Sequence, residues 1–232
     1  MNYLEDFEND LNKVEKLISV PNLIKEHVLE MLKDINFSNF NDNLEKKKLN
    51  NGIRVIENIS DGSLNKEFSI IYNQVCILAV SSLSANIEKY FKNFIATSKT
   101  ATNIKNLDKI KLNLNEALQY GNINFDNLGD IILKKDTSVN FQDLQGTIRS
   151  FNECLGKIIK LEDNLKNKII FYQQCRHVLV HKNGFVDDNF IKKTDKESNI
   201  KKYEIGNVVQ LDSKDWADMK SSFLEFYKEL VN

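Results

Sequence analysis

The stretch LNKEFSIIYNQVCILAVSSLSANIEKYFKNFIAT, residues Leu64–Thr97, decides the fold because it predicts one long and mostly apolar helix. Apolar residues recur along one stripe at three- and four-residue spacing, Tyr72 and Val75 among them, as in a helix that buries one face. Ser82 and Asn86 lie on the same stripe. These polar groups either point toward a functional helix or hydrogen-bond within a bundle.

Three further helices are predicted before this stretch. Apolar spacing indicates an amphipathic helix over residues 3–19, and Pro21 is expected to end it. A second helix follows over residues 22–36, on which His27 is expected to be structural or exposed. A third helix is expected over residues 44–59.

Asp61-Gly62 is a turn signal and the expected boundary between two parts of the chain. Residues 1–60 would form an N-terminal helical accessory segment, and residues 64–232 a helical domain. One proline and eight glycines in 232 residues suit long helices. We therefore expect an all-α fold.

The chain after the long helix also reads as helical. Short helices and loops are expected over residues 98–140, with Gly121 and Gly129 as breaks, and helices over residues 141–155 and 163–183. Residues 204–211 are expected to form a short extended piece. Asp212 is expected to cap a last helix over residues 214–230, with Asp215 at its third position. Three aromatic residues would pack that helix down: Trp216, Phe223 and Phe226.

Chemistry concentrates in CRHVLVHKNG, residues 175–184, which holds two of the three histidines in the chain. At about 100° per residue, Gln173, His177 and His181 stack one turn apart, and Arg176 lies on their flank. Asn183-Gly184 is expected to end the helix. Histidine moves protons near neutral pH, and arginine holds phosphate. Together they are a minimal set for cutting RNA without a metal.

The pattern Arg176-His177-x-x-x-His181 resembles the motif of the HEPN (higher eukaryotes and prokaryotes nucleotide-binding) superfamily. The continuation HKNGFVD, residues 181–187, is similar to a form common in prokaryotic members. SSLSANIEKYFKNFI, Ser81–Ile95, resembles an early HEPN helix with a glutamate and an aromatic residue, here Glu88 and Tyr90. VNFQDLQGTIRSFNECLG, Val139–Gly156, is similar to a segment upstream of the motif.

The resemblance covers roughly residues 64–232 and implies a helical bundle that dimerises with its two motifs facing each other. Many such domains are metal-independent endoribonucleases that act as toxins or antiviral effectors. The resemblance makes Arg176, His177 and His181 the expected catalytic residues of an RNA-cleaving homodimer, held off by an antitoxin or another regulatory partner protein. We expect Gln173, Asn183, Asn86 and Glu88 to support the site.

Other readings of the same residues stay open. The module could be a non-catalytic HEPN domain that binds a nucleotide, RNA or a protein partner. It could also be a helical interaction protein whose functional surface is residues 1–60. His177 and His181 could hold zinc, but no third ligand follows in a known pattern, so no metal or cofactor is expected. Glu88 is more simply a solvated charge or a partner in helix packing.

Composition limits the setting. A net charge of −1 argues against sequence-independent coating of nucleic acid, so RNA would need a local cationic cleft. Five lysines close to the motif in sequence could supply it: Lys182, Lys192, Lys193, Lys201 and Lys202. The three cysteines fit neither a disulfide framework nor a zinc site, which favours a reducing cytoplasm. The apolar run from Ile70 to Leu83 is short and interrupted by polar residues, so no membrane span is expected.

Overall fold

The computed structural model describes residues 2–33, 64–97, 110–121, 123–196 and 203–232, and the single positions 47, 51 and 54. Within these residues every regular element is a helix, which confirms the all-α prediction. The helices are α1 (Tyr3–Lys33), α3 (Leu64–Thr97), α4 (Leu114–Tyr120), α5 (Phe125–Lys135), α6 (Leu144–Leu155), α7 (Asp163–His181), α8 (Asp188–Thr194) and α9 (Ser213–Val231).

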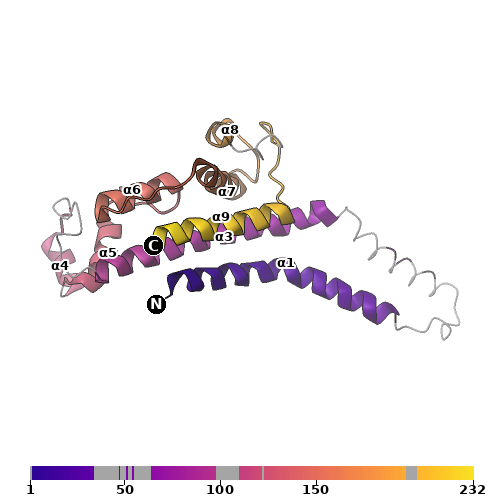
Figure 1. The fold of residues 1–232 in the computed structure, drawn as a ribbon, viewed down its shortest axis with the longest axis horizontal. Coiled ribbons are helices and arrows are strands. Elements are labelled where there is room, and N and C mark those ends of the chain that lie inside the picture. Colours follow the sequence, from indigo (N-terminus) through magenta and orange to yellow (C-terminus); the bar gives the residue numbers. More distant parts are fainter. Residues whose placement is uncertain are drawn as a thin grey trace.

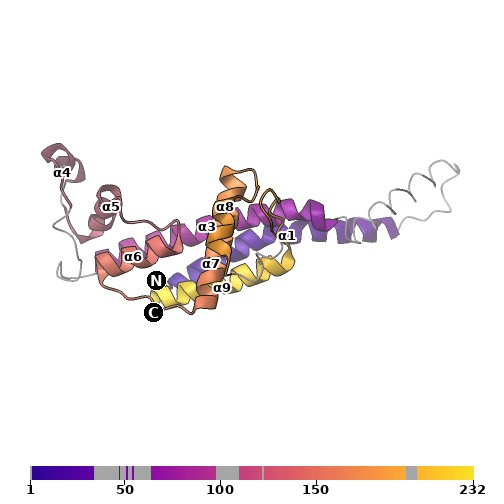
Figure 2. The ribbon, with the colours of Figure 1, turned by 90° about the horizontal axis from the view of Figure 1, so that it is seen from above.

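The helices form two layers around α3. In Figure 1, α1 runs antiparallel to α3, and α9 lies alongside both, while α6, α7 and α8 form the layer above. Figure 2 shows α7 crossing over α3 and α9 at a steep angle, with α4 and α5 at one end of the molecule. The crossing leaves one long face of α7 pointing away from the core.

Helix α3 is the centre of the core, as its apolar stripe predicted. It contacts α1, α5, α7 and α9, and its residues Val75, Ala79, Ile87 and Phe91 are buried. Burying one helix against four neighbours removes a large apolar area from water, and this burial is the main stabilising contribution to such a fold.

Residues Ser69–Thr97 of α3 are also long and apolar enough, by length and composition alone, to cross a membrane. This differs from the expectation drawn from the shorter run between Ile70 and Leu83. The contacts of α3 with four other helices account for its apolar composition.

The N-terminal half of α1 belongs to the same core as the rest of the molecule. Phe7 and Leu11 are fully buried, and the Phe7 ring lies 4.7 Å from that of Tyr227 in α9, measured between centroids. The N-terminal half of α1 is therefore packed into the bundle, whereas Leu17, Leu23 and Met31 further along the helix are exposed. The expected third helix over residues 44–59 and the expected boundary at Asp61-Gly62 lie outside the described ranges, apart from the isolated helical positions 47, 51 and 54.

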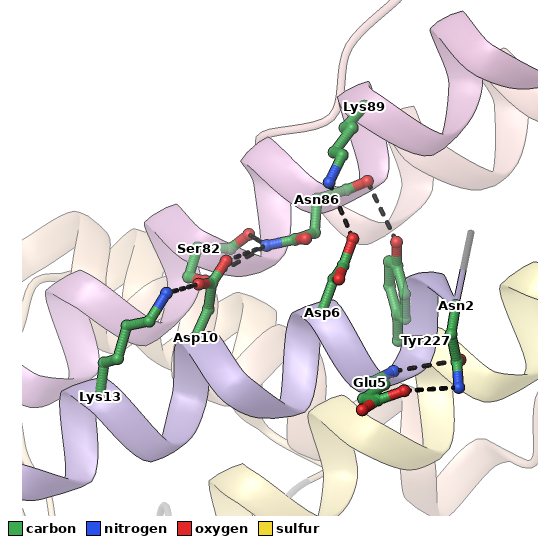
Figure 3. A network of polar contacts seen from close by, with 9 residues as sticks. All are labelled: Asn2, Glu5, Asp6, Asp10, Lys13, Ser82, Asn86, Lys89 and Tyr227. Atoms are coloured by element: carbon green, nitrogen blue, oxygen red, sulfur yellow. Dashed lines mark hydrogen bonds and ion pairs between the residues drawn. The ribbon is translucent and has the colours of Figure 1, made fainter.

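A polar network reinforces this packing (Figure 3). The Asn86 amide donates to Asp10 Oδ2 at 3.1 Å and to the Ser82 carbonyl at 3.0 Å. The Tyr227 hydroxyl donates to the Asn86 carbonyl at 3.2 Å. Lys89 pairs with Asp6 at 2.9 Å. Asn86 thus joins α1, α3 and α9.

Two predicted helix breaks are wrong. Helix α1 continues through Pro21, so the expected helices over residues 3–19 and 22–36 are one element as far as Lys33. A proline costs an interior helix about 3 kcal/mol, and the packing of this 31-residue helix on α3 and α9 offsets it. Gly129 lies inside α5. Its missing side chain lets α5 approach α3, because a Cβ there would lie 2.9 Å from Lys92 Cα.

The remaining sequence predictions for the C-terminal half largely hold. Gly121 ends α4 with a φ of 64°, and α6 begins after the N-cap Asp143. Asp212 and Asp215 form the expected capping box of α9, whose three aromatic residues are buried: Trp216, Phe223 and Phe226. The expected extended piece contributes a single antiparallel bridge, between Phe185 and Val208. Helix α8 was not predicted.

We predict that Phe7→Ala destabilises the protein by about 3–5 kcal/mol, the usual cost of emptying a buried phenylalanine site. The neighbouring exposed residue provides the control, and Glu8→Ala should change stability by less than about 0.5 kcal/mol. Urea denaturation of the full chain measures both. Equal stabilities of the two variants would show that α1 does not belong to the core.

Candidate functional site

Helix α7 presents the candidate residues because its other face is fixed in the core. Tyr172 and Cys175 are fully buried, and the Cys76 thiol of α3 donates to the Tyr172 carbonyl at 3.6 Å. The Tyr172 hydroxyl donates to Asp218 of α9 at 2.9 Å, and Lys168 pairs with the same carboxylate. These contacts fix the rotation of α7 about its axis.

His177 and His181 meet on the outer face of α7, as their four-residue spacing predicted. Their ring centroids are 5.0 Å apart, with an interplanar angle of 51°. His181 is exposed in the last turn, whereas His177 is half-buried. The pair offers two proton-transfer groups on an accessible surface.

Arg176 precedes this pair by one residue but faces a different direction. It is half-buried and lies about 100° from His177 and about 140° from His181 around the helix axis. Among the residues described, its guanidinium forms no hydrogen bond or ion pair with another side chain. Around the helix axis, Arg176 and His181 of one chain thus start from different sides of α7.

Helix α7 ends at His181, two residues before the expected end at residue 183, and His181 lies in the last turn as predicted. The amides of Lys182 and Gly184 both donate to the Val178 carbonyl at 2.9 Å. Asn183 and Gly184 have φ values of 51° and 81°, the left-handed region that favours asparagine and glycine. Asn183 is exposed and lies in the turn beside His181.

The imidazole of His177 is held toward its neutral form. Burial, His181, Lys193 and Arg176 each lower its pKa from the ordinary 6.5, and Asp187 opposes them. Burial disfavours the charged imidazolium, and a nearby positive charge disfavours it further. His177 is therefore neutral at physiological pH and can accept a proton.

Gln173 lies one turn before His177 but faces the interior. It is buried, and its Oε1 accepts a hydrogen bond from the Leu144 amide at 3.0 Å. Because that amide belongs to the first turn of α6, Gln173 joins α6 to α7. Its contact is structural.

Asn86 and Glu88 lie away from the histidine pair. Asn86 takes part in the α1–α3–α9 network, and Glu88 pairs with Lys92 at 2.7 Å. Cys76 lies where α3 contacts α7. Glu88 lies about 18 Å further along α3 than Cys76. His27 is exposed on α1.

Cys175 precedes Arg176 but offers no nucleophile. Cys76, Cys154 and Cys175 are all buried. Burial raises the pKa of both Cys76 and Cys175, so these thiols stay protonated and unreactive.

A polar groove of about 630 Å³ opens between α6, α7 and α8. Four of its lining residues are cationic: Arg149, Lys192, Lys193 and Lys196. Two of these, Lys192 and Lys193, are among the lysines expected near the motif. Lys182 is exposed, whereas Lys201 and Lys202 lie outside the described residues. Sequence reasoning missed Arg149, Lys196 and Gln174, although Gln174 lies only about 20° from His181 around α7.

An exposed apolar patch lies at the end of α7. Exposed apolar side chains gather there in sequence and across the Phe185–Val208 bridge: Val180, Phe185, Ile205 and Val208. In the described part of the chain, no group of three or more histidine, cysteine, aspartate or glutamate residues could hold a metal ion.

Comparisons of the chain with protein-family models, with curated proteins and with solved structures find no match. The residues themselves and the motif resemblance are therefore what indicates a function.

We predict that the pKa of His177 lies below 6.5 in the folded protein and rises in Lys193→Gln, because removing a nearby positive charge stabilises imidazolium. The unfolded state binds this proton more readily, so stability should fall as the pH drops from 6.5 through the folded pKa. Lys193→Gln should lose less stability than the wild type over the same fall in pH. Proton NMR titration of the histidines measures the shift, and Lys13→Gln is a distant control. An unchanged pKa in Lys193→Gln would contradict the prediction.

Proposed function

We propose that this chain is a metal-independent endoribonuclease of the HEPN type, acting as a toxin or antiviral effector. The observation that carries the proposal is the histidine pair on the exposed face of α7, with centroids 5.0 Å apart and Arg176 in the same turn. The resemblance of residues 64–232 to HEPN domains supplies the reaction class. A cationic groove beside the pair supplies a place for RNA.

The reaction is an internal transfer within the RNA backbone. The 2′-oxygen attacks the adjacent phosphorus, a P–O2′ bond forms, and the P–O5′ bond breaks. The 2′-hydroxyl loses a proton to a base, and the leaving 5′-oxygen gains one from an acid. The products are a 2′,3′-cyclic phosphate and a 5′-hydroxyl.

Each residue has one role in this scheme. His181, exposed at the helix end, serves as general base or acid. His177, whose pKa is lowered, shares the proton transfer or orients His181. Arg176 stabilises the extra negative charge of the five-coordinate phosphorus.

A homodimer would complete the site. Arg176 and His181 of one chain diverge by about 140° around α7, so one phosphate is reached more easily by residues from two chains. The exposed apolar side chains at the end of α7, including Phe185 and Val208, support association there. A symmetric pair would bury the same patch twice.

The location and regulation of the enzyme are also proposed. A cytoplasmic RNA-cutting toxin needs restraint, and an antitoxin or other partner protein covering the exposed His181 would provide it. No metal or cofactor is required by this scheme.

We predict that Arg176→Ala and His181→Ala each reduce RNA cleavage at least about 100-fold and relieve growth inhibition on expression. Partly exposed polar side chains contribute little to folding, so stability should change by about 1 kcal/mol or less. Cleavage of labelled RNA and bacterial growth measure the effects, and His27→Ala is the matched histidine control.

Two results would contradict the nuclease proposal. One is a wild-type protein that cuts no RNA in a broad panel and is not toxic. The other is activity that vanishes in EDTA and returns with zinc or magnesium, since the described residues contain no metal-binding cluster. In the first case the non-catalytic HEPN binding module is preferred, because the cationic groove needs no catalysis.

We predict that the active protein is a dimer whose sites draw on both chains. Light scattering should give about twice the 26.9 kDa chain mass. A mixture of Arg176→Ala and His181→Ala chains should regain part of the activity that each lacks alone. A strictly monomeric active enzyme, or an inactive mixture of verified heterodimers, would contradict a shared site.

A further inference from the structure

The groove between α6, α7 and α8 has the composition of a nucleotide site. Its volume of about 630 Å³ lies within the usual range of ligand pockets, about 300–1,000 Å³. Leu144 and Ile170 provide apolar surface, Gln174 provides a side-chain amide, and cationic residues line it. A flat base, a sugar and a phosphate need these three kinds of surface.

The strongest indication of a ligand is Gln174. Its side chain lines the groove and is 9 % exposed. Its Oε1 is buried without a hydrogen-bond partner among the described residues. An enclosed acceptor without a donor is destabilising, so a ligand N–H reaching Gln174 would recover that loss.

The cationic side of the groove is available for phosphate. Lys192 pairs with Asp188, and Asp143 is occupied by the Gly146 amide at 2.7 Å. Lys193 and Lys196, in contrast, form no ion pair within the described ranges. With Asp195 on the same side, these two lysines still leave net positive charge where α8 borders the groove.

The groove and the histidine pair share one face of α7. Around the helix axis, Gln174 lies about 20° from His181, and Ile170 about 20° from His177. Lys193, which lines the groove, is close enough to His177 to lower its pKa. A strand of RNA lying in the groove would thus continue directly onto His177 and His181.

We infer that the groove binds one nucleotide, with its base against Gln174 and its phosphate on Lys193 and Lys196. The inference deepens the proposed function, on which RNA as the source of this nucleotide rests. Gln174 is a specificity-determining residue in this arrangement. It selects the base beside the scissile phosphate and takes no part in proton transfer.

The chemistry of Gln174 also predicts which bases bind. The exocyclic amino groups of adenine, cytosine and guanine can donate to its Oε1. Uracil has no amino group, so only its single ring N3–H can donate to Oε1. Uracil should therefore bind least tightly.

The test measures binding without cleavage. Fluorescent 2′-O-methyl oligomers of eight adenosines, cytidines or uridines lack the attacking hydroxyl, so the intact wild-type chain can be used. Anisotropy should show at least about tenfold weaker binding of the uridine oligomer. Gln174→Leu should abolish that difference, whereas Gln142→Leu, at an exposed glutamine outside the groove, should preserve it.

Substitution of the lysines should produce a different pattern. Lys193→Gln combined with Lys196→Gln should weaken all three oligomers equally. It should also make the salt dependence shallower by about 1.4 in the slope of log affinity against log salt, for two lost phosphate contacts. Lys13→Gln with Lys16→Gln on α1 is the matched control.

The source of the nucleotide is distinguished by calorimetry with free AMP, CMP and UMP. Selective binding of free AMP or CMP that is lost in Gln174→Leu, without the same selectivity for oligomers, would assign the groove to a free nucleotide. Selectivity among oligomers assigns it to RNA. Equal binding of all bases, a preference that survives Gln174→Leu, or binding of inorganic phosphate alone would overturn the inference.

Two controls separate this inference from folding and from catalysis. Gln174→Leu removes an unpartnered buried acceptor, so its Tm without nucleotide should equal or exceed that of the wild type. A wild type that selects bases through Gln174 but cuts no RNA would refute the nuclease and keep the groove. Cleavage by a wild type whose base preference does not depend on Gln174 would refute the groove inference and keep the nuclease.

Discussion

The rotation of α7 about its own axis is the constraint on which the rest of the site depends. Tyr172 is fully buried, and its hydroxyl needs a partner, which Asp218 of α9 provides at 2.9 Å. With Tyr172 held there and Cys76 of α3 bonded to its carbonyl, the opposite face must point outward. That face carries the accessible His177 and His181 and the groove-lining Gln174, so one buried hydroxyl determines which polar groups lie on the outer side of α7.

Periodicity predicted the long elements well because tertiary packing agreed with it. Helix α3 begins and ends where its apolar pattern does, and the capping box of α9 was readable from Asp212 and Asp215. Pro21 and Gly129 misled because each was judged by local preference alone. The 31-residue helix α1 tolerates one missing hydrogen bond at Pro21. A glycine in a helix can serve a close contact between helices, as Gly129 does with α3.

The candidate site was only partly readable from the sequence. Helical arithmetic placed His177 and His181 together, and the structure brings their rings to 5.0 Å. Gln173 lies on the same arc, but its Oε1 accepts a hydrogen bond from the Leu144 amide of α6. A contact with another helix leaves no signal in the local sequence pattern. Asn86 likewise hydrogen-bonds to Asp10 of α1 and Tyr227 of α9, and the local sequence pattern gives no signal of these contacts. The sequence named Lys192 and Lys193 as cationic candidates, but the groove itself depends on α8, an element that the sequence did not predict, and so Arg149 and Lys196 were not joined to them.

The packing of α9 against both α1 and α7 has a consequence for the order of synthesis. On the ribosome α1 emerges first, α7 much later, and α9 after every other described helix. Until α9 is available, Tyr172 lacks Asp218 and Phe7 lacks Tyr227. A nascent chain that already exposes Arg176 and His181 therefore has no fixed α7 to hold them. The rotation of α7, and with it the face that carries these residues, is therefore fixed only after α9 has been synthesised.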